Sequence, residues 1–429
     1  DKMSKLTKLI TKPRLFFRDA KINRSNTEPS KQVAKKNIPA QKKVEIKKEK
    51  VVTKPKINSL DHFNILDDIR VILHSGESFD AGVAHLKPWI AVLMRSNVKF
   101  LILVRNLNLF EWVKTNFPWT YVSYAKGAQD IENLLNKMPY VNTVLYPSST
   151  GNNIHLVRFS YLNHIFIGHG DSDKASSAHK GLRLYDEIWT AGEAHIDRFR
   201  NSDFNTQHMI FNKVGRPNSK KIIEACQSNW KERNYRVLYL PTWEGHFEES
   251  NYSSALISGG IIQTVANNIK LHIDAKFHHI TGSRISELKK IDANLSQYNS
   301  DEESRVTIIP RTIPVDTILA TYNIFICDIS AVISECLAGN GPIFVYIPQD
   351  REINISNSNM AYSDYCYTFS TLNELEEKLS SVLDGNDYLE EKRKFAMNYI
   401  LGYEETLNDK FVKEMKKIYE QPHEIKQLK

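Results

Sequence analysis

The sequence predicts an α/β protein with two doubly wound parallel sheets, preceded by a basic arm. From residue 68 onward, short apolar runs alternate with stretches of helical periodicity, which is typical of successive βαβ units. The chain has 429 residues, which is too long for one ordinary core. Its hydrophobic content of 41% and charged content of 25% are those of a soluble globular protein.

The basic character of the chain belongs to its first residues. Residues 1–56 hold 18 Lys and Arg against five Asp and Glu, a charge of +13, whereas the remainder carries −6 of the total of +7. Apolar residues lie among these lysines at helical spacing, which favours a helix on an anionic membrane surface: Met3, Leu6, Leu9, Ile10, Leu15, Phe16 and Phe17. Residues 25–56 are interpreted as a solvated linker. A partner-binding tail and a nucleic-acid arm are the alternatives, but clustered apolar residues favour the membrane.

The first series of expected strands follows this arm. These strands are Arg70–His74, Lys99–Val104, Tyr121–Ser123, Thr143–Tyr146, Asn163–Ile167, Glu187–Thr190 and Met209–Asn212, with a helix expected over Ala81–Arg95. A second series comprises Arg236–Leu240, Leu271–Phe277, Val306–Ile309, Ile324–Cys327 and Pro342–Tyr346. Helices are expected over Ala331–Ala338, Leu372–Leu383, Asp387–Tyr399 and Leu407–Tyr419. We therefore expect an arm and linker over 1–60, Rossmann-like domains over 61–216 and 217–400, and a C-terminal helix over 401–429.

Several classes of protein lack support in the sequence. No stretch reaches the roughly 20 apolar residues of a membrane span, and no secretion signal is visible, so we expect a cytoplasmic protein. The four cysteines lack CxxC spacing, which indicates reduced thiols and neither a disulfide framework nor a zinc site. Glycine-rich loops of the Walker or dinucleotide type are absent.

The most informative segment ends the strand expected at Asn163–Ile167. There the apolar run stops at Gly168-His169-Gly170, and Lys174 follows five residues after the histidine. Gly170 is expected to let the backbone turn sharply. Because open α/β sheets bind ligands beyond the carboxyl ends of their strands, the histidine is placed to take a proton and the lysine to meet a phosphate.

Four segments resemble motifs of the CDP-glycerol:poly(glycerophosphate) glycerophosphotransferase family, the teichoic-acid and capsule polymerases. The His-Gly-x-x-x-Lys loop of the family resembles His169, Gly170 and Lys174, and the strand and turn after it resemble Tyr185–Gly192. Its Ala-Pro-Thr-Trp segment is similar to Leu240–Trp243, and its Lys-Pro-His-Pro-Leu-Thr-Gly segment to Lys276–Gly282. Its Ser-Asp-x-Ser-Ser motif with a later acidic residue is similar to Cys327–Glu335. The resemblance covers roughly residues 160–350 and implies a GT-B fold, with the acceptor on the first domain and the nucleotide donor on the second.

This chain departs from the family pattern at four places. Asp171-Ser172-Asp173 replaces Thr-Pro-Leu, Phe277 and His279 replace two prolines, and Ala331 replaces the second serine. These changes leave the side chains for chemistry in place but put the identity of the transferred group in doubt. The Asp171-x-Asp173 spacing also mimics a metal-binding DxD motif. Because it lies inside the His-Gly-x-x-x-Lys frame, we expect no metal and a metal-independent reaction.

The resemblance also implies residue roles. His169 would be the general base, and His278 with Lys276 would stabilise charge on the phosphate from the second domain. Ser330, at the start of a helix, and Asp328 would hold a phosphate, although plain N-capping is an alternative for both. Further substrate or nucleotide contacts are expected from Gly170, Lys174, Thr242, Trp243, Thr281, Gly282, Ala331 and Glu335, the last of them with the ribose hydroxyls. The remaining histidines show no metal or triad spacing, and we expect most of them to be ordinary: His74, His85, His155, His164, His179, His195 and His279.

The implied function is transfer of glycerol phosphate from CDP-glycerol to a hydroxyl of a capsule or teichoic-acid-like glycan at the inner face of the membrane. Two alternatives stay open. The same fold could transfer a sugar from a CMP-, UDP- or GDP-linked donor, again with His169 as the base. An inactive member of the family could also serve as a membrane-bound scaffold.

Overall fold

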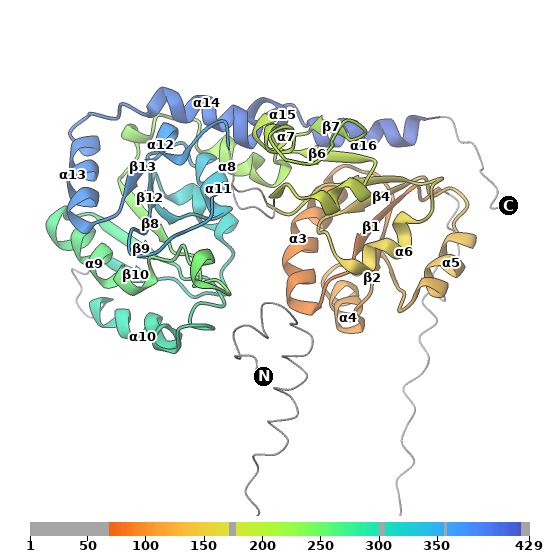
Figure 1. The fold of residues 1–429 in the computed structure, drawn as a ribbon, viewed down its shortest axis with the longest axis horizontal. Helices are drawn as coiled ribbons and strands as arrows, with labels where there is room; N and C mark the ends of the chain where they lie inside the picture. The colour runs from red at the N-terminus through yellow and green to blue at the C-terminus, as the bar shows by residue number, and fades with distance from the viewer. Residues whose placement is uncertain (1–67, 171–176, 300–304, 356–357, 422–429) are drawn as a thin grey trace, which may run out of the picture. The chain divides into compact units, whose positions relative to one another are not determined.

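The computed structural model describes residues 68–170, 177–299, 305–355 and 358–421. Helices and strands are labelled as in Figure 1. All of these residues belong to one unit, which spans residues 57–429. The basic arm, together with Asp171, Asp173 and Lys174, lies outside the described residues, so the predictions for them remain predictions.

The first sheet has seven strands in the order β3-β2-β1-β4-β5-β6-β7, and every pair is parallel. The strands are β1 (Val71–Ser75), β2 (Phe100–Val104), β3 (Tyr121–Tyr124), β4 (Thr143–Tyr146), β5 (Asn163–Phe166), β6 (Glu187–Thr190) and β7 (Ile210–Lys213). The order reverses between β1 and β4, which makes this pair the topological switch point, where open sheets bind ligands.

The second sheet has six strands in the order β10-β9-β8-β11-β12-β13, again all parallel. The strands are β8 (Arg236–Leu240), β9 (His272–Ala275), β10 (Val306–Ile308), β11 (Ile324–Asp328), β12 (Ile343–Tyr346) and β13 (Tyr367–Phe369). Its switch point lies between β8 and β11. Figure 1 shows the two sheets in separate parts of the ribbon, each with helices around it. The predicted α/β class with two doubly wound sheets is therefore confirmed.

Helices follow most of the strands. They are α3 (Phe79–Arg95), α4 (Leu107–Asn116), α5 (Ala128–Asn136), α6 (Ile154–Val157), α7 (Glu193–Arg200), α8 (Lys220–Ala225), α9 (Ser258–Gln263), α10 (Ile291–Leu295), α11 (Val332–Leu337), α12 (Tyr362–Tyr365), α13 (Leu372–Leu383), α14 (Glu390–Leu401), α15 (Tyr403–Leu407) and α16 (Lys410–Glu420). Side-chain caps explain two of the starts. The side chain of Asn106 accepts a hydrogen bond from the Leu109 amide at 3.0 Å, and that of Thr371 accepts one from the Glu374 amide at 3.2 Å.

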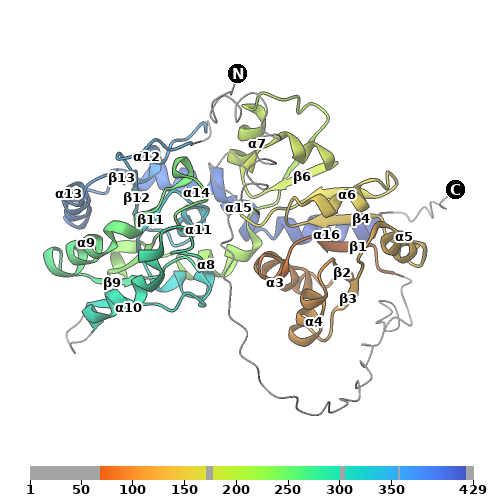
Figure 2. The ribbon, with the colours of Figure 1, turned by 60° about the horizontal axis from the view of Figure 1, so that its bottom comes forward.

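Apolar side chains cover both faces of each sheet, because strands of a parallel sheet are buried on both sides. The last helix returns to the first sheet. Phe411, Met415 and Ile418 of α16 pack in the same cluster as Val71 and Leu73 of β1. Figures 1 and 2 both show α16 alongside the strands of the first sheet. Residues at opposite ends of the described chain therefore share one core.

Three details differ from the sequence predictions. The helix predicted over Leu407–Tyr419 is divided, because Asp409 adopts a left-handed φ of 52° between α15 and α16. The short strand β13 was not predicted, since three residues carry too little periodicity to be recognised. Helix α11 has six residues instead of the eight predicted from Ala331 to Ala338.

Two further observations concern the whole described part. All four cysteines are buried and free, and the Sγ atoms of Cys327 and Cys336 lie 3.6 Å apart. Within the ranges that the structure describes, no helix is both long and apolar enough to cross a membrane.

Candidate functional site

His169 lies just beyond the carboxyl end of β5, on an exposed turn. Its Nδ1 is 2.7 Å from the carbonyl oxygen of Pro147, the residue after β4. Because a carbonyl can only accept, Nδ1 must carry the proton, and in the neutral ring Nε2 is left with its lone pair. The turn is made at Gly168, which has a φ of +64° and whose carbonyl accepts from the indole of Trp89 at 2.7 Å. Gly170, expected to let the backbone turn sharply, does not have a left-handed φ, so the left-handed residue here is Gly168.

The ring of His169 is stacked on a second imidazole. The ring centroids of His85 and His169 are 3.5 Å apart, with 16° between the planes. His85 Nδ1 in turn lies 3.6 Å from Glu77 Oε1. His169 is exposed as a residue, but His85 covers one face of its ring; this partial loss of water, and next the charge of His85, lower the pKa of His169 below its usual 6.5, against a weaker opposing effect of the Pro147 carbonyl. At neutral pH the ring is therefore uncharged and able to take a proton at Nε2.

Arg216 joins the His169 turn to helix α11 of the second sheet. Its guanidinium donates to the backbone oxygen of His169 at 3.3 Å and lies 3.9 Å from Glu335 Oε1. A Cβ built on Gly170 would lie 3.5 Å from the Cβ of Ala331, so these two backbones are neighbours as well. Burial raises the pKa of Glu335, and Arg216 partly opposes this effect. The structure thus brings together four of the predicted site residues: His169, Gly170, Ala331 and Glu335.

A buried carboxylate lies at the switch point of the second sheet. Asp328, at the end of β11, accepts at Oδ2 from the amides of Thr242 at 2.8 Å and Ser254 at 2.9 Å. Its Oδ1 is buried and has no hydrogen-bond partner in the part of the chain that the structure describes. Burial raises the pKa of Asp328 to about 7. The carboxylate therefore ties the loop after β8 to β11, beside the position where a nucleotide would lie in such a sheet.

A third group follows β9. The Nζ atom of Lys276 donates to the backbone oxygen of Arg311 at 3.3 Å, and Arg311 donates to the backbone oxygen of Thr281 at 2.7 Å. The fully buried Glu244 carboxylate accepts from the Gly282 amide at 2.8 Å. Gly282 has a φ of +88°, and a Cβ there would come within 2.4 Å of backbone, so glycine is required. Burial, and next Arg311, lower the pKa of Lys276.

The remaining predicted residues lie on neighbouring loops of the second sheet. The Nδ1 atom of His278 accepts from the Ile280 amide at 3.4 Å, and its ring is 4.3 Å from that of His279. Trp243 follows β8, its ring 4.8 Å from His246. Ser330 donates to the backbone oxygen of Asp328 at 3.3 Å and does not cap the helix with its side chain. Because α11 is so short, its dipole contributes less at Ser330 than an eight-residue helix would.

Sequence reasoning missed three residues of this arrangement: Glu77, His85 and Arg216. His85 was expected to be ordinary, yet its ring covers a face of His169. A signal did exist, because Glu77 follows the first strand and the loops after β1 and β4 must meet at the switch point. No such pattern in the sequence indicated that Arg216 would contact the His169 turn. Among the described residues, no group of His, Cys, Asp and Glu side chains could hold a metal ion.

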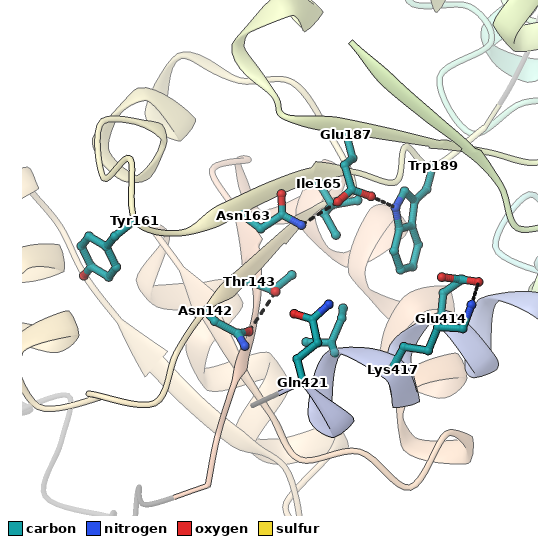
Figure 3. Close-up of a pocket in the computed structure, with 11 residues that line it drawn as sticks. Asn142, Thr143, Tyr161, Asn163, Ile165, Glu187, Trp189, Glu414, Lys417 and Gln421 are labelled. Atoms are coloured by element: carbon teal, nitrogen blue, oxygen red, sulfur yellow. Dashed lines mark hydrogen bonds and ion pairs between the residues drawn. The ribbon is translucent and has the colours of Figure 1, made fainter. Parts of the chain in front are cut away.

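A polar pocket of about 310 Å³ lies at the end of the first sheet where the strands begin, opposite the end that carries His169 (Figure 3). It is lined by the amino ends of β4 to β6 and by α16, and Glu187 accepts there from Asn163 and from Trp189, each at 2.7 Å. His169 follows the carboxyl end of β5, so this pocket is separate from the candidate site.

No family model and no curated protein matches the chain. Solved structures do resemble it. The wall teichoic acid polymerase TagF matches with a TM-score of 0.54 at 13% identity, over 84% of this chain and 92% of that chain. A glycosyltransferase from Rickettsia africae matches with a TM-score of 0.50 at 12% identity, over 82% and 98%.

A UDP-GlcNAc 2-epimerase from Methanocaldococcus jannaschii matches with a TM-score of 0.51 at 12% identity, over 81% and 99%. The names of these neighbours describe different reactions, and a shared fold does not select among them. Two doubly wound parallel sheets that match these neighbours give the chain the GT-B fold.

Proposed function

We propose that this chain is a transferase that moves glycerol phosphate from CDP-glycerol to a hydroxyl group of a capsule or teichoic-acid-like glycan. The observation that carries the proposal is the state of His169. Its Nδ1 proton is held by the Pro147 carbonyl at 2.7 Å, and its ring is uncharged at neutral pH, so Nε2 can accept a proton. The resemblance of four motifs to the glycerophosphotransferase family supports the choice of donor, as does the likeness to TagF, of which one variant was soaked with CDPG.

In the proposed reaction, the acceptor hydroxyl gives its proton to Nε2 of His169 as its oxygen attacks the phosphorus that bears glycerol. A new P–O bond forms, the P–O bond to CMP breaks, and CMP leaves with the electron pair. His278 donates from Nε2 to the phosphate oxygens, since its Nδ1 accepts from the Ile280 amide. Lys276 adds positive charge nearby, and Lys174 meets the phosphate from the first sheet.

The donor nucleotide is proposed to lie at the switch point of the second sheet. Thr242 and Asp328 are bound to each other there, and Trp243, Thr281 and Gly282 lie on loops at the same end of the sheet. Ser330 and Ala331 would contact the phosphates, and Glu335 would accept from ribose hydroxyls. No metal ion takes part in this proposal.

Product analysis tests the proposal directly. The chain is incubated with short glycan acceptors and, in separate reactions, with CDP-glycerol and with CMP-, UDP- and GDP-sugars, and products are read by mass spectrometry. We expect a mass increment of glycerol phosphate with CDP-glycerol. Turnover with a nucleotide sugar alone would assign the chain to sugar transfer, for which His169 could serve equally well. No product from any donor, while the chain is folded, would favour a scaffold.

We also propose that residues 1–56 attach the enzyme to the anionic inner face of the membrane. Each basic residue near such a surface contributes on the order of 1 kcal/mol, and apolar residues such as Leu6 and Phe17 add hydrophobic anchoring. Deletion of 1–56 should abolish co-sedimentation with anionic vesicles and leave turnover of a soluble acceptor unchanged. Binding of the full chain should weaken with salt without vanishing. Equal sedimentation of both chains would refute the anchor, and tight binding to duplex DNA without binding to vesicles would assign the arm to nucleic acid.

A further inference from the structure

We propose that His85 is a positioning residue for His169: the stacked pair of imidazoles holds the ring of His169 in one orientation and opposes a positive charge on it. The proposal deepens the proposed function, because it concerns the residue to which that function assigns the general base. It assigns a role to a histidine whose spacing in the sequence indicated none.

Helix α3 contacts the His169 turn at two places. The imidazole of His85 stacks on His169, and the indole of Trp89 donates to the Gly168 carbonyl at 2.7 Å. These two side chains are four residues apart and therefore lie on one face of the helix. A third contact fixes the helix itself, because a Cβ on Gly82 would come within 2.4 Å of Leu109 in α4, so α3 packs closely there. The His85 ring thus projects from a helix that packs closely against α4.

Stacking and hydrogen bonding restrict different motions of the His169 ring. The bond from Nδ1 to the Pro147 carbonyl fixes the direction of one ring edge but still allows the plane to tilt about that bond. The parallel His85 ring, 3.5 Å away, opposes this tilt. Together they aim Nε2 in one direction, and a base must be held within hydrogen-bond reach of the proton that it removes.

The charged and titratable groups around His169 come from four elements. His85 projects from α3 and Arg216 from the segment after β7, and both disfavour a charged His169. The Pro147 carbonyl after β4 and Glu77 after β1 favour the charge. Glu77 faces His85 first, with Oε1 3.6 Å from Nδ1, and this neighbour is the main cause that lowers the pKa of Glu77. The carboxylate therefore lies beside His85, whose Nδ1 has no hydrogen-bond partner among the described residues.

Two variants separate the two effects of His85. His85→Phe keeps a stacked aromatic ring but cannot bear a charge, whereas His85→Ala removes the ring. His208→Phe is the matched control, because His208 is exposed and lies on the segment before β7. Each variant is titrated by NMR, with the His169 resonance assigned by its loss in His169→Gln, and kcat and KM are measured with CDP-glycerol.

In His85→Phe we expect the titration midpoint of His169 to rise by about one pH unit, with kcat retained. In His85→Ala we expect kcat to fall by about ten- to a hundredfold with KM for the donor unchanged, because the base is no longer aimed. His208→Phe should change neither quantity. An unchanged His169 midpoint in His85→Phe, or an unchanged kcat in a folded His85→Ala, would overturn the proposal.

The titration also keeps the two proposals distinguishable. If the wild-type chain turns over no nucleotide donor, the proposed function fails, while a shifted His169 midpoint in His85→Phe still supports the coupling of the two rings. If His85→Ala does not fold, His85→Phe alone decides the matter through its midpoint.

Discussion

The turns that carry His169 and His278 use the same residue type in opposite ways. At His169, Nδ1 donates to the Pro147 carbonyl at 2.7 Å and Nε2 keeps its lone pair. At His278, Nδ1 accepts from the Ile280 amide at 3.4 Å, so in the neutral ring Nε2 carries the hydrogen. One backbone group beside each ring thus makes the first histidine a proton acceptor and the second a hydrogen-bond donor.

The two turns also differ in the geometry of these contacts. The ring of His169 has a short hydrogen bond and a parallel ring against it, whereas the bond at His278 is long and its neighbour His279 is exposed and tilted by 33°. A base needs a fixed direction, but a charge-stabilising donor can adjust as the phosphate arrives. Backbone contacts, which the sequence motifs do not encode, therefore set the tautomer that each histidine adopts in its neutral form.

Glutamine substitutions test this division with the largest expected effect. An amide can donate a hydrogen bond but cannot take a proton, so His169→Gln should lower kcat by two to four orders of magnitude, roughly the value of a general base. His278→Gln keeps a donor and should lose about tenfold, whereas His278→Ala should lose on the order of 10²-fold. Steady-state kinetics on folded variants measures both.

Circular dichroism of each variant provides the folding control. Equal losses of kcat in His169→Gln and His278→Gln would show that the two histidines have the same catalytic role, which would contradict the proposed division between base and donor.

Arg216 connects the first of these turns to the second sheet, and its loss should have an intermediate effect. Arg216→Met removes the bond to the His169 carbonyl and leaves Glu335 without its cation. We expect kcat/KM to fall by about tenfold or more, and Glu335→Gln added to it should recover part of the loss, because neighbouring sites couple.

Arg200→Met is the matched control for this experiment. Arg200 also lies 2.6 Å from a glutamate, but its side chain is 58% exposed and its ion pairs are with Glu193 and Asp197 of its own helix, α7. If Arg200→Met lowers activity as much as Arg216→Met, the effect of Arg216 is not specific.

The two sheets should respond oppositely to pH in their stability. Burial lowers the pKa of His74, at the end of β1, from 6.5 to about 3, so its contribution is present above pH 6.5 and is lost as pH falls toward 3. Burial raises the pKa of Asp328 from 3.8 to about 7, so its contribution is present below pH 3.8 and is lost as pH rises through 7.

Urea unfolding followed by tryptophan fluorescence across this pH range checks both signs. His74→Phe keeps a ring against Tyr146 and should flatten the acid side of the stability profile, because the unfolded state no longer takes up that proton. Asp328→Asn should make the free energy of unfolding less dependent on pH between about 4 and 7. These limits are the pKa values of Asp328 in the unfolded and the folded chain, 3.8 and about 7. If the free energy of unfolding has the same slope against pH in the wild type and in His74→Phe, the lowered pKa of His74 is contradicted.

Removal of metal ions should have the smallest effect of all. Activity is expected to persist in EDTA, since Lys174, Lys276 and His278 supply positive charge and hydrogen bonds to a diphosphate. Loss of activity that magnesium or manganese restores would instead assign a metal to Asp171 and Asp173.

The sheets were predictable because their strands are short, apolar and separated by helical periodicity. Arg236–Leu240 and Leu372–Leu383 were predicted with the bounds that the structure gives. The candidate residues could be placed in the fold as well, because polar residues that follow a buried strand lie where that strand ends. The family resemblance named Thr242 and Asp328 separately, and the switch point explains why the structure joins them by a hydrogen bond.

The contacts between elements were not predictable in the same way. His85 reaches His169 because α3 crosses the sheet at a particular angle, which local periodicity does not specify. The hydrogen bonds that set the two histidine tautomers come from backbone groups, which every residue carries and which leave no mark in the sequence. Arg216 has no neighbouring motif, and its role arises only when the two sheets are both in place.

The return of α16 to the first sheet has a consequence for biosynthesis. The Arg70 guanidinium donates to the backbone oxygen of Tyr419 at 2.8 Å, a pairing across 349 positions of the chain, and Phe411 and Met415 complete the core around β1. A nascent chain emerges from the ribosome N-terminus first. Part of the apolar surface of the first sheet therefore stays exposed to water until the second sheet and residues 410–420 have been synthesised.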